Sequence, residues 1–107
     1  MTIYQDYFNN LFVFDMQDGT ERKLLSLSKY PFVRWRYHSN NIYFTNGENL
    51  ISYSLETHKE TIVLGKIDTD EKIILDFSLF EENENLKFIL QIQSIKSNDV
   101  VLLEASK

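Results

Sequence analysis

NLFVFDMQDGTERKLL, residues 10–25, and NLISYSLETHKETIVL, residues 49–64, share one layout, and this repetition decides the fold class. Residue 10 falls on residue 49, and we call this displacement the repeat offset. The apolar positions then coincide: Leu11 with Leu50, Phe14 with Tyr53 and Leu25 with Leu64. The match extends upstream, where Ile3-Tyr4 falls on Ile42-Tyr43. A period of about 40 residues indicates a repeated supersecondary unit.

The apolar residues of the repeat alternate with period two, as in a β-strand. Side chains at 50, 52 and 54 would lie on one face, and Ile51, Tyr53 and Leu55 on the other. A helical repeat would instead show apolar residues at i, i+3, i+4 and i+7. The aromatic content of 14% also favours strands. The pattern predicts an all-β protein.

The central unit contains four predicted strands, at residues 32–37, 41–45, 50–55 and 61–64. Turn-forming residues separate them, including Asn46-Gly47, and Asp18-Gly19 marks the corresponding hairpin in the first copy. A third unit begins at Lys72, continues through a polar loop (FEENEN, 80–85) and ends at 100–104. The first unit lacks its opening strand and the last lacks its closing strand. We therefore predict ten antiparallel strands, in groups of three, four and three, within one domain spanning 1–107.

The run of IYFT, LISYSLET and KETIVL resembles a bacterial β-propeller repeat. This resemblance implies antiparallel blade-like meanders, about two and a half blades, forming a half-propeller. Closed propellers have at least four blades, roughly 160 residues at this period. The chain should then be an open stack of sheets, or should pair with another chain, for instance as a homodimer. Such repeats serve unrelated activities, so the resemblance concerns the fold alone.

Composition narrows the classes of function. Sixteen acidic and eleven basic residues give a formal net charge of −5, which argues against a nucleic-acid partner. The chain has no cysteine, and no apolar run approaches the roughly 20 residues of a membrane span. The first ten residues lack the features of a secretory signal. We expect a cytoplasmic protein with no membrane partner.

Catalytic and metal-binding motifs are absent from the sequence. His38 and His58 fall in predicted turns on one rim, where a metal pair is conceivable but exposed turn histidines are the simpler interpretation. DTDE at 68–71 lacks the glycine and glutamate of a calcium loop. We expect no catalytic residue, no cofactor and no metal site, and hence no enzyme.

VRWRY at 33–37 is the one cluster of basic and aromatic residues. Such a cluster can bind single-stranded nucleic acid, but the negative net charge opposes this function. Arg36 aligns with Asp76 in the next unit, so the two side chains could pair between neighbouring strands. Trp35 is expected to be largely buried between sheets.

Acidic residues gather in the predicted turns, and loops on a rigid strand scaffold commonly carry function. One rim would hold Asp18, Glu56, Glu81, Glu82 and Glu84, and the opposite rim Asp68, Asp70 and Glu71. The first rim is the more negative. Tyr30 and Phe80 are candidate aromatic anchors beside these acids.

In size, charge and repeat style the chain resembles the immunity proteins of bacterial contact-dependent growth inhibition systems. The resemblance implies that it binds and neutralises a basic protein toxin, a nuclease, with acidic loops occupying the active-site cleft. The alternative is a structural or scaffold half-propeller that dimerises and binds a peptide or small ligand. An enzyme is the third alternative.

Overall fold

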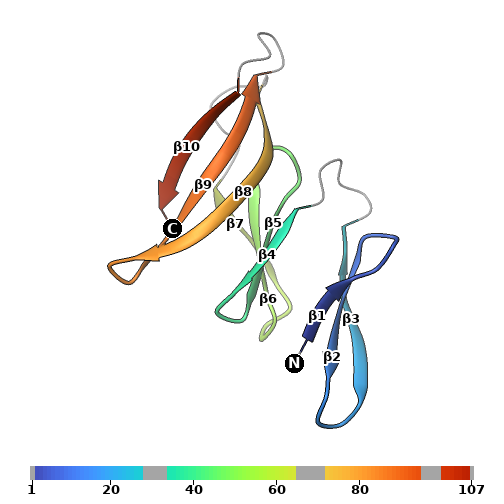
Figure 1. Cartoon of the computed structure of the whole chain (residues 1–107). Coiled ribbons are helices and arrows are strands. Elements are labelled where there is room, and N and C mark those ends of the chain that lie inside the picture. Colours follow the sequence, from blue (N-terminus) through green and yellow to red (C-terminus); the bar gives the residue numbers. More distant parts are fainter. Residues whose placement is uncertain (1, 28–33, 65–71, 95–99, 107) are drawn as a thin grey trace.

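A computed structural model describes residues 2–27, 34–64, 72–94 and 100–106. The described strands, in chain order, are β1 (Thr2–Gln5), β2 (Asn10–Asp15), β3 (Thr20–Ser26), β4 (Trp35–His38), β5 (Asn41–Thr45), β6 (Leu50–Ser54), β7 (Glu60–Leu64), β8 (Lys72–Glu82), β9 (Asn85–Ser94) and β10 (Val100–Ser106). They form three antiparallel sheets, β1-β2-β3, β4-β5-β6-β7 and β8-β9-β10 (Figure 1). The all-β class and the grouping into three, four and three strands are confirmed. In this part of the chain no helix has the length and hydropathy needed to cross a bilayer.

The β2–β3 and β6–β7 hairpins are copies of one another in register. Phe14 pairs with Glu21, and the repeat offset carries this pair onto Tyr53 and Glu60, which also face each other. Both ladders shift register at the same place, between Leu11 and Phe12 in β2 and between Leu50 and Ile51 in β6. A β-bulge at the same position in both copies means that the sequence repeat is also a structural repeat. The predicted equivalence of residues 10–25 and 49–64 is confirmed.

The upstream match is wrong by one residue. In the first sheet Gln5 pairs with Leu11, whereas in the second sheet Thr45 pairs with Leu50. The β1–β2 loop is therefore one residue longer, and Asn9 within it adopts a positive φ of 62°. Because side chains alternate with period two, this residue reverses the face of every β1 side chain. Ile3 takes the place of Tyr43, and not that of Ile42.

Among the residues that the structure describes, two hydrophobic clusters join the three sheets. The first cluster joins Leu11 of the first sheet, and Leu27 just after β3, to the second sheet. Its members from the second sheet and the residue that follows β6 are Ile42, Phe44, Ile51, Tyr53 and Leu55. The other joins Tyr43 and Leu50 of the second sheet to Ile74, Phe77, Phe88, Leu90 and Ile92 of the third. The middle sheet is consequently covered on both faces, which explains why four consecutive residues of β6 are buried. Figure 1 shows it lying between its two neighbours.

Candidate partner-binding surface

The longest hairpin, β8–β9, carries three of the acidic residues singled out in the sequence, Glu81, Glu82 and Glu84. FEENEN was predicted as a loop, and this prediction is wrong: only Asn83 and Glu84 form the turn. Both have positive φ, 53° and 66°, as in the tight two-residue turns that suit the twist of a hairpin. Eleven and ten residues make β8 and β9, against four to seven in the other strands. The hairpin end therefore extends past the middle sheet (Figure 1).

Three glutamates, Glu81, Glu82 and Glu84, are exposed at this end, which we call the acidic tip. Glu81 contacts His38, with 2.9 Å between Oε1 and Nε2. Glu82 accepts a hydrogen bond of 3.1 Å from the Lys87 ammonium across the hairpin. Since both carboxylates remain more than half exposed, at 59% and 55%, these contacts orient them without removing them from solvent. The tip can therefore present negative charge to a partner.

Two of the other predicted site residues lie in separate turns. Asp18, between β2 and β3, accepts hydrogen bonds from the Thr20 hydroxyl and backbone N–H. These bonds, the hydroxyl first, lower the pKa of the Asp18 carboxyl. Glu56 is exposed between β6 and β7. Each turn ends its own hairpin in Figure 1, apart from the acidic tip.

The remaining predicted site residues divide into one described residue and four others. Phe80 lies in β8, half-buried, and pairs across the ladder with Lys87. It is thus close enough to the acidic tip to serve as an apolar contact. Tyr30, Asp68, Asp70 and Glu71 lie outside the described residues.

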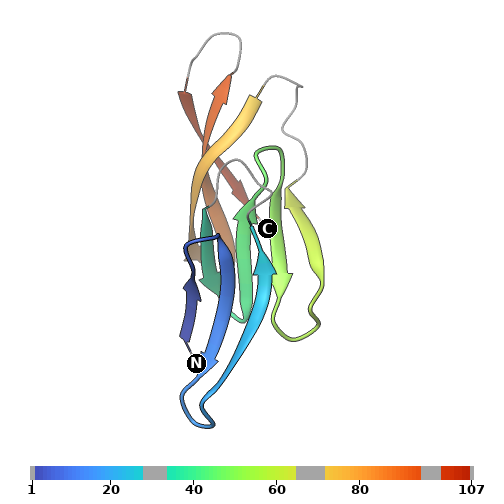
Figure 2. The ribbon, with the colours of Figure 1, turned by 90° about the vertical axis from the view of Figure 1, so that its right-hand side faces the viewer.

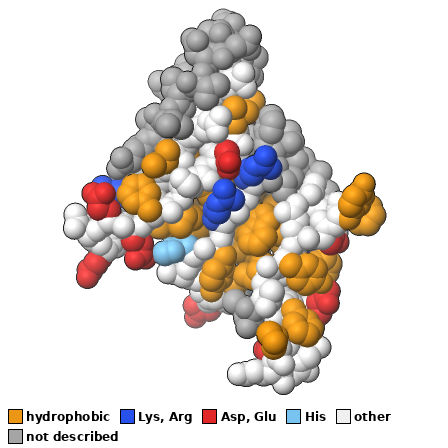
Figure 3. Space-filling model, viewed as in Figure 1, with side chains coloured by type: hydrophobic (Ala, Val, Ile, Leu, Met, Phe, Trp, Pro, Cys, Tyr) orange, Lys and Arg blue, Asp and Glu red, His pale blue; other side chains and the backbone are white. Residues whose placement is uncertain are grey.

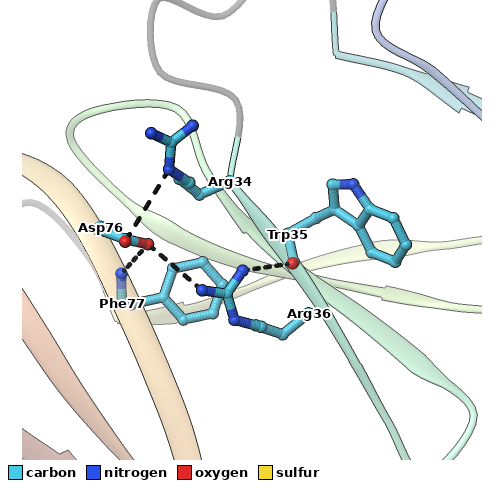
Figure 4. Close-up of polar contacts among 5 residues, drawn as sticks. All are labelled: Arg34, Trp35, Arg36, Asp76 and Phe77. Atoms are coloured by element: carbon cyan, nitrogen blue, oxygen red, sulfur yellow. Dashed lines mark hydrogen bonds and ion pairs between the residues drawn. The ribbon is translucent and has the colours of Figure 1, made fainter. Parts of the chain in front are cut away.

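The predicted pairing of Arg36 with Asp76 is confirmed, and Arg34 joins it (Figure 4). Nitrogen–oxygen distances are 3.8 Å for Arg36 and 3.9 Å for Arg34. Asp76 also accepts a hydrogen bond of 2.7 Å from the Phe77 backbone N–H, and the Arg36 guanidinium carbon lies 5.8 Å from the centre of the Phe77 ring. These contacts join β4 to β8, at the edges of neighbouring sheets. In Figure 3 basic and acidic side chains meet at the middle of the visible face.

Trp35 differs from its prediction. It is half-buried, packs against the cluster between the first and second sheets, and its indole N–H donates a hydrogen bond of 2.8 Å to Gln5. β4 is an edge strand of its sheet, so its side chains are covered less completely than those of β5. Trp35 is therefore a contact between sheets at the border of the core.

The histidines occupy different environments. His38 is the last residue of β4, and not a turn residue as predicted. His58 lies in the β6–β7 turn, where its Nδ1 is 3.1 Å from the Tyr53 hydroxyl. Among the residues that the structure describes, no group of three or more His, Asp and Glu side chains could hold a metal ion.

A surface that the sequence reasoning missed is the outer face of the first sheet. Tyr4, Phe12 and Phe14, which we call the outer aromatic face, alternate with the core residues Leu11 and Val13. The run LFVF, residues 11–14, is apolar on both faces of its strand. This pattern is the feature of the sequence that could have indicated a second apolar face. Hydrophobic side chains gather over this sheet in Figure 3.

Comparison with protein-family models, with curated proteins and with solved structures gives no match to this chain.

Proposed function

We propose that this protein is a small inhibitor of the immunity-protein type, which binds a basic protein toxin, a nuclease, and occludes its active-site cleft. The observation that carries the proposal is the acidic tip: three exposed carboxylates at the end of the longest hairpin. A nuclease cleft is lined with cations that bind phosphates. A narrow hairpin end bearing carboxylates has the charge and the shape to enter such a cleft.

The contacts around the tip support this role. His38 and Lys87 hold Glu81 and Glu82 in place, so less side-chain freedom remains to be lost on binding. Glu84 lies in the turn itself. Phe80, two residues before the end of β8, would add an apolar contact beside the charged ones. The net charge of −5 would speed association with a basic partner.

We also propose that the three sheets are propeller-type blades, about two and a half of them, forming a half-propeller. The equal registers of the β2–β3 and β6–β7 hairpins and their matching bulges support a repeated unit. The face-to-face stacking of three antiparallel meanders is the arrangement of neighbouring blades. The acidic tip would then belong to one rim of the blade stack.

The experiment begins with the toxin encoded next to this chain's gene, purified as its nuclease domain. We expect tight binding, inhibition of nucleic-acid cleavage, and an association rate that falls as salt is raised from 0.1 M to 1 M, since the screening length falls from ~10 Å to ~3 Å. Reversing Glu81, Glu82 and Glu84 to lysine should lower the association rate at least ~10-fold and weaken inhibition. Circular dichroism of the triple variant should match that of the wild type.

The matched control reverses Asp68, Asp70 and Glu71, the acids predicted for the opposite rim. That variant should inhibit as well as the wild type. Loss of inhibition by the control alone would place the binding surface on the opposite rim. A neighbouring toxin that neither binds nor is inhibited would refute the proposed function.

A further inference from the structure

The outer aromatic face is open in this structure. The Tyr4 and Phe12 rings stack, with centroids 5.4 Å apart and planes at 17°, and Tyr4 is 37% exposed. Tyr7 and Phe8, in the adjoining β1–β2 turn, are 93% and 69% exposed. Figure 2 looks onto this sheet, and no described element lies in front of it. Uncovered aromatic side chains gathered on one sheet indicate an interaction surface.

The register shows which covered face corresponds to this open one. The repeat offset carries Phe12 and Phe14 onto Ile51 and Tyr53, in hairpins of equal register. Tyr4 pairs with Phe12 as Phe44 pairs with Ile51, so Tyr4 takes the place of Phe44. These three counterparts in the second sheet are buried: Phe44 0%, Ile51 6% and Tyr53 7% exposed. What covers them is the opposite face of the first sheet, through Leu11.

The same arrangement recurs at the next interface. The β4–β5 and β8–β9 turns are both two residues long, with positive φ at both residues. Aligned on these turns, Phe88 takes the place of Phe44 and Lys87 that of Tyr43. Phe88 is buried, 1% exposed, against the face of the second sheet that carries Tyr43. We call the sheet face that holds the position equivalent to Phe44 the Phe44-type face, and the opposite face the Tyr43-type face. At both interfaces, therefore, a Phe44-type face of one sheet packs against a Tyr43-type face of the next.

We infer that the outer aromatic face is covered by a second copy of this chain, through the outer face of that copy's third sheet. Among the described residues, this outer face is the Tyr43-type face against which no other sheet packs. It presents Ile89, 37% exposed, with Phe80 and Lys87 half-buried beside it. The contact is head to tail, so each copy uses both of its outer faces, and the assembly either closes into a ring or extends. This inference does not rest on the proposed toxin partner, although Phe80 and Lys87 adjoin both this face and the acidic tip.

The test is the size of the purified protein, measured by sedimentation velocity and light scattering. The wild type should be larger than a monomer. Phe14→Lys, on the aromatic face, and Ile89→Lys, on the third sheet, should each lower the association constant at least ~10-fold. Ile62→Lys is the matched control, because Ile62 is 59% exposed on the second sheet, away from both outer faces, and this variant should associate normally.

Mixing distinguishes this geometry from a symmetric contact. An equimolar mixture of Phe14→Lys and Ile89→Lys should associate again, since each variant keeps the face that the other has lost. Tyr7→Lys, at the border of the aromatic face, gives a second weakened variant without altering a strand. A monomeric wild type would overturn the inference. So would an Ile89→Lys variant that associates as well as the wild type, because two aromatic faces would then be meeting each other.

Discussion

At the level of single residues, Gly19 and His58 show that two different residue types adopt the same backbone conformation. They occupy the same turn position in the two copies of the repeat, with φ of 70° and 59°. Each donates its N–H over 2.9 Å to a carbonyl four residues earlier, on Asp15 and Ser54. Glycine adopts this conformation freely, whereas the histidine adds a side-chain contact to Tyr53. The two copies thus share geometry more closely than residue type.

Asp6 provides the pH dependence expected at this scale. Hydrogen bonds from the backbone N–H of Asn10, then from its side chain and from the Phe8 N–H, lower the pKa of the Asp6 carboxyl. The unfolded chain, with an ordinary pKa of about 3.9, therefore binds the proton first as pH falls. The stabilisation is present above that pH and is lost as pH falls through the lower folded-state value. Asp6→Asn should thus reduce the free energy of unfolding at pH 6 more than at pH 2.5.

Urea titration at the two pH values measures this difference. The variant keeps a side-chain acceptor, as Asn46 does in the second copy, where its Oδ1 accepts from the Glu48 and Asn49 N–H groups. An equal effect of the substitution at both pH values would contradict the assignment.

At the scale of the element, the sequence predicts hairpins better than it predicts which way strands face. The β2–β3 and β6–β7 hairpins are predicted correctly because the turn residues and the spacing of the apolar residues indicate the same structure. β1 is placed one residue out because loop length, which the pattern of Ile3-Tyr4 does not contain, decides its register. FEENEN reads as a loop because acidic residues are poor strand formers, yet an exposed hairpin end accommodates them. The exposure of its glutamates follows from the sequence, whereas their position on a projecting hairpin does not.

Edge and central strands should differ in how much their aromatic residues stabilise the fold. Phe44 lies in the central strand β5 and is 0% exposed. Replacing it with alanine should lower the free energy of unfolding by about 3–5 kcal/mol. Trp35, half-buried in the edge strand β4, should cost about 2 kcal/mol, since less of its surface leaves water. Tyr37→Ala, at 46% exposure, is the control and should cost less than either. Equilibrium unfolding in urea gives the three values, and a larger loss for Trp35 than for Phe44 would contradict the placement of the core.

At the scale of the whole molecule, three sheets are stacked into a flattened body with extents of 50 × 36 × 19 Å. Apolar contacts provide most of the cohesion between sheets, through the two clusters on either side of the middle sheet. Polar contacts between the described residues fix how the sheets are positioned. They include the Trp35–Gln5 hydrogen bond between the first and second sheets. Between the second and third sheets they include the 2.7 Å backbone hydrogen bond from Ile74 to Gly47, the His38–Glu81 contact and the pairing of Asp76 with the two arginines. The stack should therefore depend little on charge for its stability.

The Arg36–Asp76 pair tests this expectation. Its side chains are 44% and 38% exposed, so solvent screens their attraction. A double-mutant cycle with Arg36→Gln and Asp76→Asn should give a coupling free energy below about 1 kcal/mol, falling further in 1 M salt. Thermal and urea unfolding of the four proteins measure it. A coupling well above that range would mean that charge pairing, and not apolar contact, sets the spacing of the second and third sheets.

Each strand of the described sheets pairs only with strands next to it in the chain. Contacts between residues that are close in the sequence close short loops, and closing a short loop costs little chain entropy. Each hairpin can therefore form before the sheets pack against one another. Folding speed in small proteins follows the mean sequence separation of contacts, and sandwiches in which distant strands pair are slow. This chain is therefore expected to fold rapidly for an all-β protein, with stacking of the finished sheets as its late step.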